Sequence, residues 1–271
     1  MKTADLKTRQ NAQSQSAALL TSLSELQGYR LLAGEEKLGK ISDYLIDETE
    51  WTIRIIVVDI GNWLTGRKVA LDSSVFHVPG SERREVRVDL TREKIESGPT
   101  LDENETVSGQ HRKALSIHYG WPMAWHAGTP GFGPTAAPVH PDTLSPFKES
   151  AAETHPEEPE SETSLHSFRE IEGYSIEATD GSIGHVEDFI ADPVDWKLRY
   201  LVVDTRKWLP GKKVLVGLNW LRSISFPDRS ARIDLQREQI RKGPLYDPDG
   251  SLDRAYEDRL HDYYNLPRYW I

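Results

Sequence analysis

The chain repeats itself, and this repeat limits its fold more than any other feature of the sequence. Residues 20–125 align with residues 165–270 at a constant offset of 145 positions without a gap, and about 33 of the 106 aligned pairs are identical. The strongest match is WTIRIIVVDIGNWLTGRK at Trp51–Lys68 with WKLRYLVVDTRKWLPGKK at Trp196–Lys213. A period of this length corresponds to a whole domain rather than to a solenoid unit. The sequence therefore predicts one small domain built twice.

Two segments lie outside the repeat. Residues 1–19 are rich in Gln, Asn, Ser and Thr, and residues 126–164 are rich in Pro, Gly, Ala, Ser and Glu, with seven acidic residues and one basic residue. Neither segment has enough apolar side chains to offset the entropy lost on ordering, about 1–2 kcal/mol per residue. We predict a disordered N-terminus over 1–19 and a flexible acidic linker over 126–164. The two domains with their tails then span 20–125 and 165–271.

Charge and cysteine content narrow the possible functions. Much of the net charge of −10 lies in the predicted linker, and the repeats themselves are nearly balanced. Without a concentrated basic surface, binding to nucleic acid or to an anionic membrane surface is not expected. The absence of cysteine excludes disulfides, thiol catalysis and cysteine-ligated metal within the sequence, and it fits a cytoplasmic protein. No apolar run is long enough to span a membrane, and we read no signal peptide.

Short strands dominate each repeat. The clearest is Ile53–Ile60, which has five Ile or Val residues among eight, and Gly34, Gly39, Gly66 and Pro79-Gly80 supply turns between the predicted strands. Five or six strands in about 60 residues leave no room for crossover helices, which favours an antiparallel all-β fold. Closure into a small barrel would remove the exposed edges. Each repeat ends in a predicted helix with an aromatic tail, over Ser108–Tyr119 and Ser251–Tyr264.

Several of these motifs, occurring twice in the same order, resemble the PRC-barrel domain. This is the small β-barrel of the photosynthetic reaction centre H subunit and of the ribosome maturation factor RimM. The resemblance covers roughly 65–75 residues of each repeat and implies two such barrels in tandem. The matching segments are Leu38–Asp47, Trp51–Asp59, Trp63–Val69, Ile183–Asp192, Trp196–Asp204 and Trp208–Gly211.

No catalytic constellation is evident. Asp59 and Asp204 each end an apolar strand, and we expect them either to form structural ion pairs with Arg54 and Arg199 or to cap the following turn. No second acid stands at a distance suited to acid–base catalysis.

Metal and cofactor sites are not expected either. Asp43 and Asp47 lie four apart on one strand face, about 13 Å from each other, which is too far to share a cation. The nine histidines form no metal-binding pattern, and we expect them to be solvated surface residues. The sequence therefore predicts no metal, no cofactor and no enzymatic activity.

The turn after the repeated strand is the candidate contact region. Its two tryptophans could anchor a partner, or they could close the mouth of a barrel. The basic residues beside them are too few for a nucleic-acid groove. The candidate interaction residues are Trp63, Leu64, Arg67, Trp208, Leu209 and Lys212.

These observations favour a non-enzymatic protein-interaction or scaffold module with an unidentified protein partner. Its two barrels either pair within the chain as a pseudo-dimer or act independently. The family resemblance implies two alternatives. One is an accessory of a photosynthetic reaction centre or another membrane complex that acts through electrostatics. The other is a ribosome-associated or RNA-processing adaptor.

Overall fold

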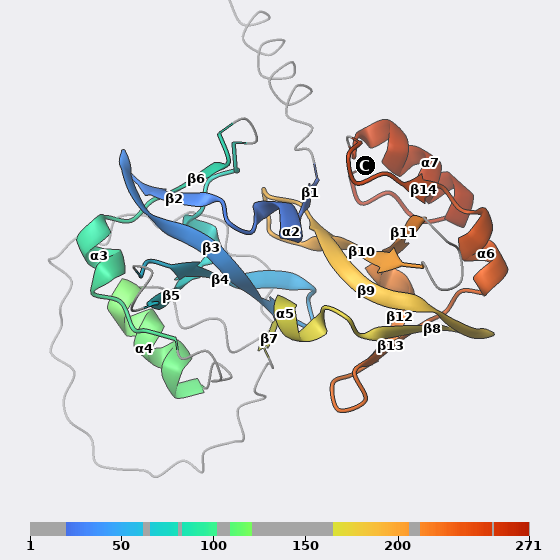
Figure 1. The fold of residues 1–271 in the computed structure, drawn as a ribbon, viewed down its shortest axis with the longest axis horizontal. Coiled ribbons are helices and arrows are strands. Elements are labelled where there is room, and N and C mark those ends of the chain that lie inside the picture. Colours follow the sequence, from blue (N-terminus) through green and yellow to red (C-terminus); the bar gives the residue numbers. More distant parts are fainter. Residues whose placement is uncertain are drawn as a thin grey trace, which may run out of the picture.

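The computed structural model shows two β-sheets side by side, one from each repeat (Figure 1). The predicted disordered segments 1–19 and 126–164 lie outside the described residues. We call residues 20–120 and 165–270 the first and second halves. The structure describes residues 20–61, 66–80, 83–101, 109–120, 165–205, 212–250 and 252–270.

The first half is built around β3 (Glu36–Asp47) and β4 (Thr52–Asp59), which pair antiparallel along most of their length. Ile and Val side chains give β4 two apolar faces, as expected for a strand covered on both sides. The remaining elements are β1 (Thr21–Ser22), α2 (Leu23–Leu26), β2 (Arg30–Ala33), β5 (Lys68–Asp72), β6 (Glu85–Val88), α3 (Arg92–Glu96) and α4 (Gly109–Tyr119).

The second half repeats this plan around β9 (Gly181–Ala191) and β10 (Leu198–Asp204). It carries more regular pairing at its ends, with two strands whose first-half counterparts are only isolated bridges at Phe76 and Thr100. The remaining elements are β7 (Leu165–Ser167), α5 (Phe168–Ile171), β8 (Ser175–Ala178), β11 (Lys213–Gly217), β12 (Leu221–Ser225), β13 (Ser230–Ile233), α6 (Arg237–Lys242), β14 (Leu245–Tyr246) and α7 (Arg254–Tyr264).

The predicted β-rich fold class is confirmed, with two differences in strand arrangement. One pair in each half, β2 with β6 and β8 with β13, is parallel rather than antiparallel. The reason lies in the 3₁₀ turn Leu218–Trp220, which leads from β11 into β12 without reversing the chain relative to the sheet. The second difference is that, within the described residues, no ladder joins β11 or β14 to β12. The chain itself spans that gap through the 3₁₀ turn.

The two halves exchange strands across an approximate two-fold axis. β1 of the first half pairs with β9 of the second, and β7 of the second half pairs with β3 of the first, in equivalent registers. At the axis, the N–H of Ile53 donates to the Trp196 carbonyl at 2.9 Å, and the N–H of Leu198 donates to the Trp51 carbonyl at 2.8 Å. Each sheet is thus completed by a strand from the other half, so the chain forms an intramolecular pseudo-dimer.

Two repeated residues secure this exchange. The Ser22 hydroxyl donates to Asp188 Oδ2, and the Ser167 hydroxyl donates to Asp43 Oδ2 at 2.6 Å. The Asp188 carboxylate also accepts from the N–H of Ser24 at 3.1 Å. Burial raises the pKa of Asp188, and these hydrogen bonds oppose the rise. Asp43, considered above as a possible metal ligand, therefore serves the junction, as does its counterpart Asp188.

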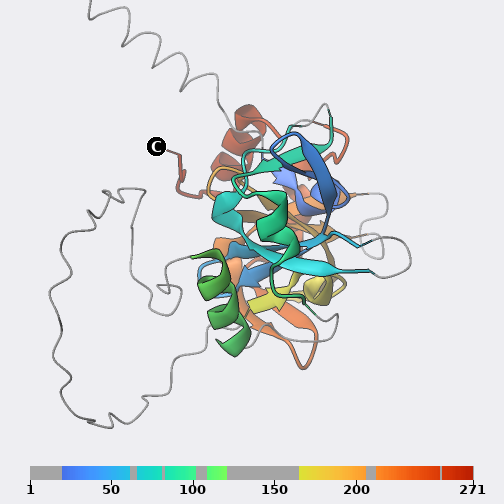
Figure 2. The ribbon, with the colours of Figure 1, turned by 90° about the vertical axis from the view of Figure 1, so that its left-hand side faces the viewer.

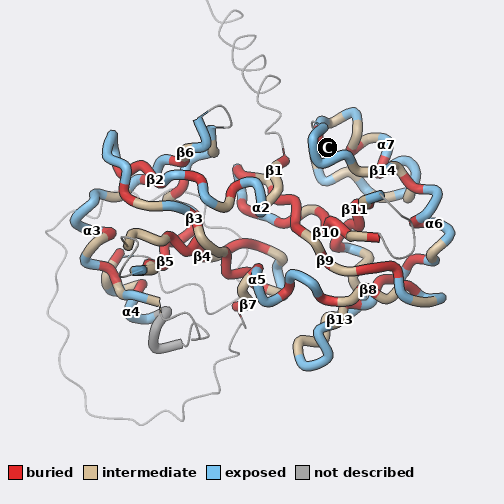
Figure 3. The backbone as a smooth tube through the Cα atoms, in the orientation of Figure 1, coloured by how far each residue is buried: buried red, intermediate tan, exposed pale blue. Residues whose placement is uncertain are grey.

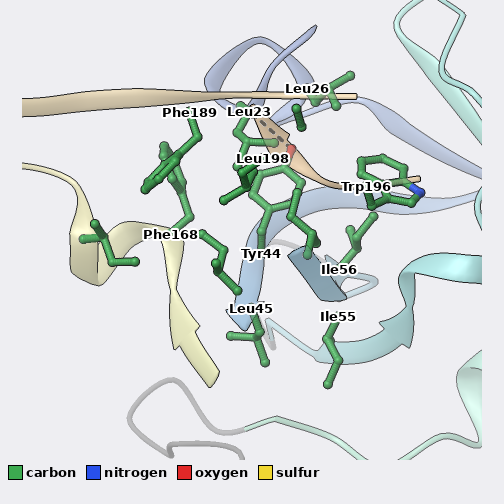
Figure 4. Close-up of a cluster of buried hydrophobic side chains, with 14 of the residues drawn as sticks. Leu23, Leu26, Tyr44, Leu45, Ile55, Ile56, Phe168, Phe189, Trp196 and Leu198 are labelled. Atoms are coloured by element: carbon green, nitrogen blue, oxygen red, sulfur yellow. Dashed lines mark hydrogen bonds between the residues drawn. The ribbon is translucent and has the colours of Figure 1, made fainter. Parts of the chain in front are cut away.

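A hydrophobic core runs continuously through the junction. Phe168 of the second half makes edge contacts with Tyr44 of the first half and with Phe189 of its own, both at ring-centre distances near 6 Å. Trp196 makes an edge contact with Phe76 of the first half. Figure 4 shows Tyr44 of the first half converging with Phe168, Phe189 and Trp196 of the second, and Figure 3 shows that the buried residues follow the central strands. The two sheets therefore share one core.

Each tail helix packs on its own half. A Cβ at Gly98 would collide with the hydroxyl of Tyr119 in α4, and a Cβ at Gly243 would collide with the hydroxyl of Tyr264 in α7. The repeated Gly-Pro therefore provides the space for a repeated tyrosine. Figure 2 views the first half with α3 and α4 in front. The predicted helix over Ser251–Tyr264 begins later than expected, at Arg254, because Asp253 caps it by accepting from the N–H of Tyr256.

Candidate interaction groove at the junction of the halves

A hollow of about 330 Å³ opens where the two halves meet. The first half lines this hollow with β1, α2 and the Val78–Pro79 segment. The second half lines it with the segments around Pro193 and Tyr246. Both halves contribute to it because β1 leaves its own half to pair with β9. The lining residues are Leu20, Thr21, Ser22, Glu25, Leu26, Tyr29, Val78, Pro79, Ile190, Pro193, Tyr246, Pro248, Gly250 and Leu252.

A second hollow of about 410 Å³ continues from the first, between the β14 segment and the start of α7. The two hollows share Tyr246, Gly250 and Leu252, so we treat them as one feature, the junction groove. The second hollow adds Pro244, Leu245, Asp247, Asp253, Tyr256 and Arg259.

The groove has an apolar floor and an acidic rim. Leu20, Leu26, Ile190 and Leu252 are buried beneath it, whereas Val78 and Leu245 remain 55% and 44% exposed at its walls. Four exposed charged residues lie at the rim. Glu25, Asp247 and Asp253 are acidic, and Arg259 is basic. The lining residues therefore combine exposed apolar surface with a net negative charge, and the guanidinium of Arg84 lies beside them, 5.3 Å from the centre of the Tyr29 ring.

The negative charge affects the pKa of Tyr246, which lines both hollows. Burial, as the largest cause, and the carboxylates of Asp188, Glu25, Glu187 and Asp247 together raise the pKa of its hydroxyl to about 12. Glu187 is paired with Lys213 Nζ at 2.7 Å, so its contribution is partly neutralised. The remaining carboxylates favour a positively charged group near Tyr246.

On the opposite side of the two-fold axis, the chain fills the equivalent position itself. His166 stands where the groove has Thr21, and its ring stacks on Phe226 with ring centres 3.4 Å apart. Carboxylates flank the imidazole, with Glu170 3.3 Å from Nδ1 and Glu48 3.6 Å from Nε2. His166 was expected at the solvated surface, but its side chain is only 16% exposed. At the groove, Thr21 and Pro193 take the positions of His166 and Glu48, and the counterpart of Phe226 is Ser81, which lies outside the described residues.

Of the predicted contact residues, only Arg67 and Lys212 are described by the structure, and neither lines this groove. Trp63, Leu64, Trp208 and Leu209 lie outside the described residues. Arg67 Nη2 donates to the Gly98 carbonyl at 3.2 Å, which ties the residue to its own half. Lys212 is exposed, and its carbonyl accepts from the Thr205 hydroxyl at 2.6 Å.

The predicted pairing of Arg54 with Asp59 was wrong. Arg54 donates to Asp47 Oδ2 through both Nε and Nη2, at 3.1 and 3.0 Å. Residues five apart on a strand point to opposite faces, so Asp59 cannot meet Arg54 there. Asp59 instead has the alternative role that we considered, because its Oδ1 accepts from the N–H of Gly61 at 2.9 Å and so caps the turn.

The predicted pairing of Arg199 with Asp204 was wrong for the same geometric reason. Arg199 Nη2 contacts Asp192 Oδ2 at 3.1 Å and Asp195 Oδ2 at 2.7 Å. Its guanidinium also lies over the ring of Tyr269, 4.0 Å from the ring centre. This arginine therefore links the start of β10 to the C-terminal tail.

A buried polar cluster that the sequence did not reveal lies under α7. The Tyr200 hydroxyl is 2.9 Å from Glu257 Oε1 and 2.7 Å from His261 Nε2, and the Tyr269 hydroxyl donates to Glu257 Oε1 at 2.6 Å. Arg254 Nη1 completes the cluster, 2.7 Å from Glu257 Oε2. His261 was expected at the solvated surface and is only 4% exposed.

Protonation within this cluster is constrained. Tyr200 has a single hydroxyl hydrogen for two neighbours. A second proton on His261 would let Nε2 donate to Tyr200 and release that hydrogen for Glu257. Burial opposes this protonation and lowers the pKa of His261. Glu257 is 1% exposed, so a solvent-borne substrate has no access to this carboxylate, and we interpret the cluster as an anchor for the tail.

No group of three or more His, Cys, Asp or Glu residues in the described part of the chain is placed to hold a metal ion. Within the same residues, no helix is both long and apolar enough to cross a membrane.

Comparison with known proteins identifies the domain type. A family model described as PRC-barrel domain matches residues 21–95 and again residues 165–240, which together cover more than half of the chain. The chain belongs to the PRC-barrel family. Both matches end before the tail helices, so α4 and α7 lie outside the matched PRC-barrel segments, whereas Tyr200 of the buried cluster lies within the second one. A search of curated proteins found no match.

Proposed function

We propose that this tandem PRC-barrel protein is a non-enzymatic scaffold whose junction groove binds a segment of another protein. The supporting observation is that both halves line the groove and leave apolar side chains exposed in it, with Val78 at 55% and Leu245 at 44%. Exposed apolar side chains around a concave surface are typical of interaction sites. The shared core supports this role, because it holds both walls of the groove in a fixed relation.

Site-directed cross-linking tests the proposal. A photo-reactive amino acid replaces Val78 in the groove or, as a matched control, Ile117, which is 72% exposed on α4. In cells of the native source, we expect a specific protein to cross-link from position 78 and not from position 117, and to bind the purified chain in vitro. Identical products from both positions, or none from position 78, would contradict the proposal.

The two alternatives from the family resemblance have direct tests of their own. A membrane-complex accessory should co-purify with membranes of the native cell, and a ribosome-associated adaptor should sediment with ribosomes at low salt. Either result, with cross-linking from position 78 absent, would replace the scaffold proposal.

A further inference from the structure

The junction groove has a counterpart on the other side of the two-fold axis, and the way that counterpart is filled indicates what the groove accepts. There, the planar ring of His166 lies on Phe226 between the carboxylates of Glu48 and Glu170. At the groove, Thr21 replaces His166, while Glu25 stands at the position of Glu170. Of the two carboxylates, the one at Glu25 is therefore kept and Pro193 stands at the position of Glu48, while the ring that would meet Glu25 is missing.

The dimensions and charge of the groove point to the rest of the occupant. Hollows of about 330 and 410 Å³ are at the small end for drug-sized ligands, and they suit individual side chains of a peptide. The exposed flank of Val78 and the buried Leu252 offer apolar contact beside Glu25 and Asp247. A segment that presents an apolar side chain next to a planar cation would match both features.

Building on the proposed function, we propose that the junction groove binds an extended segment of a partner protein in which an arginine follows an apolar residue. The apolar side chain enters the hollow above Leu26 and Leu252. The guanidinium takes the place that the His166 ring takes on the opposite side and pairs with Glu25. Arginine fits better than lysine because its flat guanidinium can bind a carboxylate with two parallel hydrogen bonds.

The test uses the full chain and a fluorescein-labelled peptide, Gly-Ser-Leu-Arg-Leu-Arg-Ser-Gly, with binding followed by fluorescence anisotropy. Two matched peptides replace either both arginines by glutamine or both leucines by serine. We expect each matched peptide to bind at least tenfold more weakly. Equal binding by the serine peptide would show attraction by net charge alone and would overturn the inference.

Protein variants locate the site. Thr21→His transfers the ring of the filled side into the groove, at a strand position whose register is the same in both halves, and should weaken binding at least tenfold. Glu25→Gln combined with Asp247→Asn should weaken it at least fivefold. Glu93→Gln with Glu172→Gln makes the same change in charge at exposed sites outside the groove, and should change it less than twofold.

Four results separate the possible failures. An effect of the Glu93/Glu172 variant as large as that of the Glu25/Asp247 variant would overturn the inference. So would full binding by a Thr21→His variant whose unfolding midpoint matches that of the wild type. Tighter binding after Lys2, Lys7 and Arg9 are replaced by glutamine in the full chain would assign the groove to the N-terminal segment of the chain itself. If cross-linking from position 78 succeeds but the peptide does not bind, the scaffold function stands and only the proposed chemistry of the partner fails.

Discussion

The two halves agree closely at the junction and differ most at the tail helices and at the rim. Both contribute an equivalent exchanged strand, an equivalent Ser–Asp hydrogen bond and an equivalent backbone contact at the axis. The differences are concentrated where each half meets solvent or its own tail. At the first-half positions Thr21, Ile55, Arg112 and Ser116, the second half has His166, Tyr200, Glu257 and His261. The repeated residues therefore maintain the pairing, and the substituted residues give each half its own contacts with its tail and at the rim.

The largest loss of stability should come from a substitution that removes contacts in both halves. Phe168→Ala removes a buried ring that contacts Tyr44 in the first half and Phe189 in the second. We expect the free energy of unfolding to fall by about 3–5 kcal/mol. Both halves should be lost in one transition, measured by denaturant unfolding with residue-resolved NMR. Leu245→Ala, at a site 44% exposed, is the control and should change stability by less than about 0.5 kcal/mol. Two separable transitions would show that the halves are independent.

The next effect should be confined to the second half. Tyr200→Phe removes the hydroxyl between Glu257 and His261, two side chains buried under α7. We expect a loss of about 1–3 kcal/mol, because buried polar groups are left with fewer partners. Tyr263→Phe deletes a more exposed hydroxyl, which donates to the Gln239 carbonyl, and should cost less than about 0.5 kcal/mol. Equal losses from the two substitutions would argue against the anchoring role of the cluster.

A smaller difference should separate the two repeated arginines. Arg199 contacts two carboxylates and the Tyr269 ring and is 15% exposed, whereas Arg54 contacts Asp47 and is 41% exposed. We expect Arg199→Met to lower the free energy of unfolding by about 1–2 kcal/mol, and Arg54→Met to lower it by less than about 1 kcal/mol, as is usual for exposed ion pairs. Thermal unfolding of the two variants side by side measures the difference. A larger loss from Arg54→Met would reverse this ranking.

The smallest effect concerns pH. Burial lowers the pKa of His261 below its ordinary 6.5, and the charged or titratable groups that face the ring are Glu257, Arg268, Tyr200 and Tyr269. Below pH 6.5 the unfolded chain takes up a proton that the folded chain resists. The contribution of His261 to stability is therefore complete above pH 6.5 and declines as the pH falls toward the folded-state pKa.

The test is the slope of the free energy of unfolding against pH, measured by urea unfolding between pH 7.5 and pH 5. His261→Gln should reduce it, and His185→Gln serves as the matched substitution on β9. A slope that is unchanged in the His261 variant would contradict the assignment.

The sequence predicted the domain type because the Trp51 and Trp196 segments carry local information: an apolar run, a turn and glycine, each present twice. The strand exchange was not readable in the same way. Ser22 and Asp188 are 166 positions apart, and nothing near either residue indicates the other. The prediction that His261 is exposed was wrong for a different reason. Helical spacing alone does not say which face of α7 points inward. The groove escaped notice because it arises only when β1 crosses to the other half.

The exchanged strands also bear on how such a chain can change over time. If each half were a separate molecule paired with an identical copy, any substitution at the junction would appear on both sides at once. Joining the copies in one polypeptide removes that constraint. One side can then close with His166 on Phe226 while the other stays open at Thr21, and neither change disturbs the hydrogen bonds that hold the pair together. Covalent fusion thus gives a symmetric assembly the freedom to specialise one of its two equivalent sites.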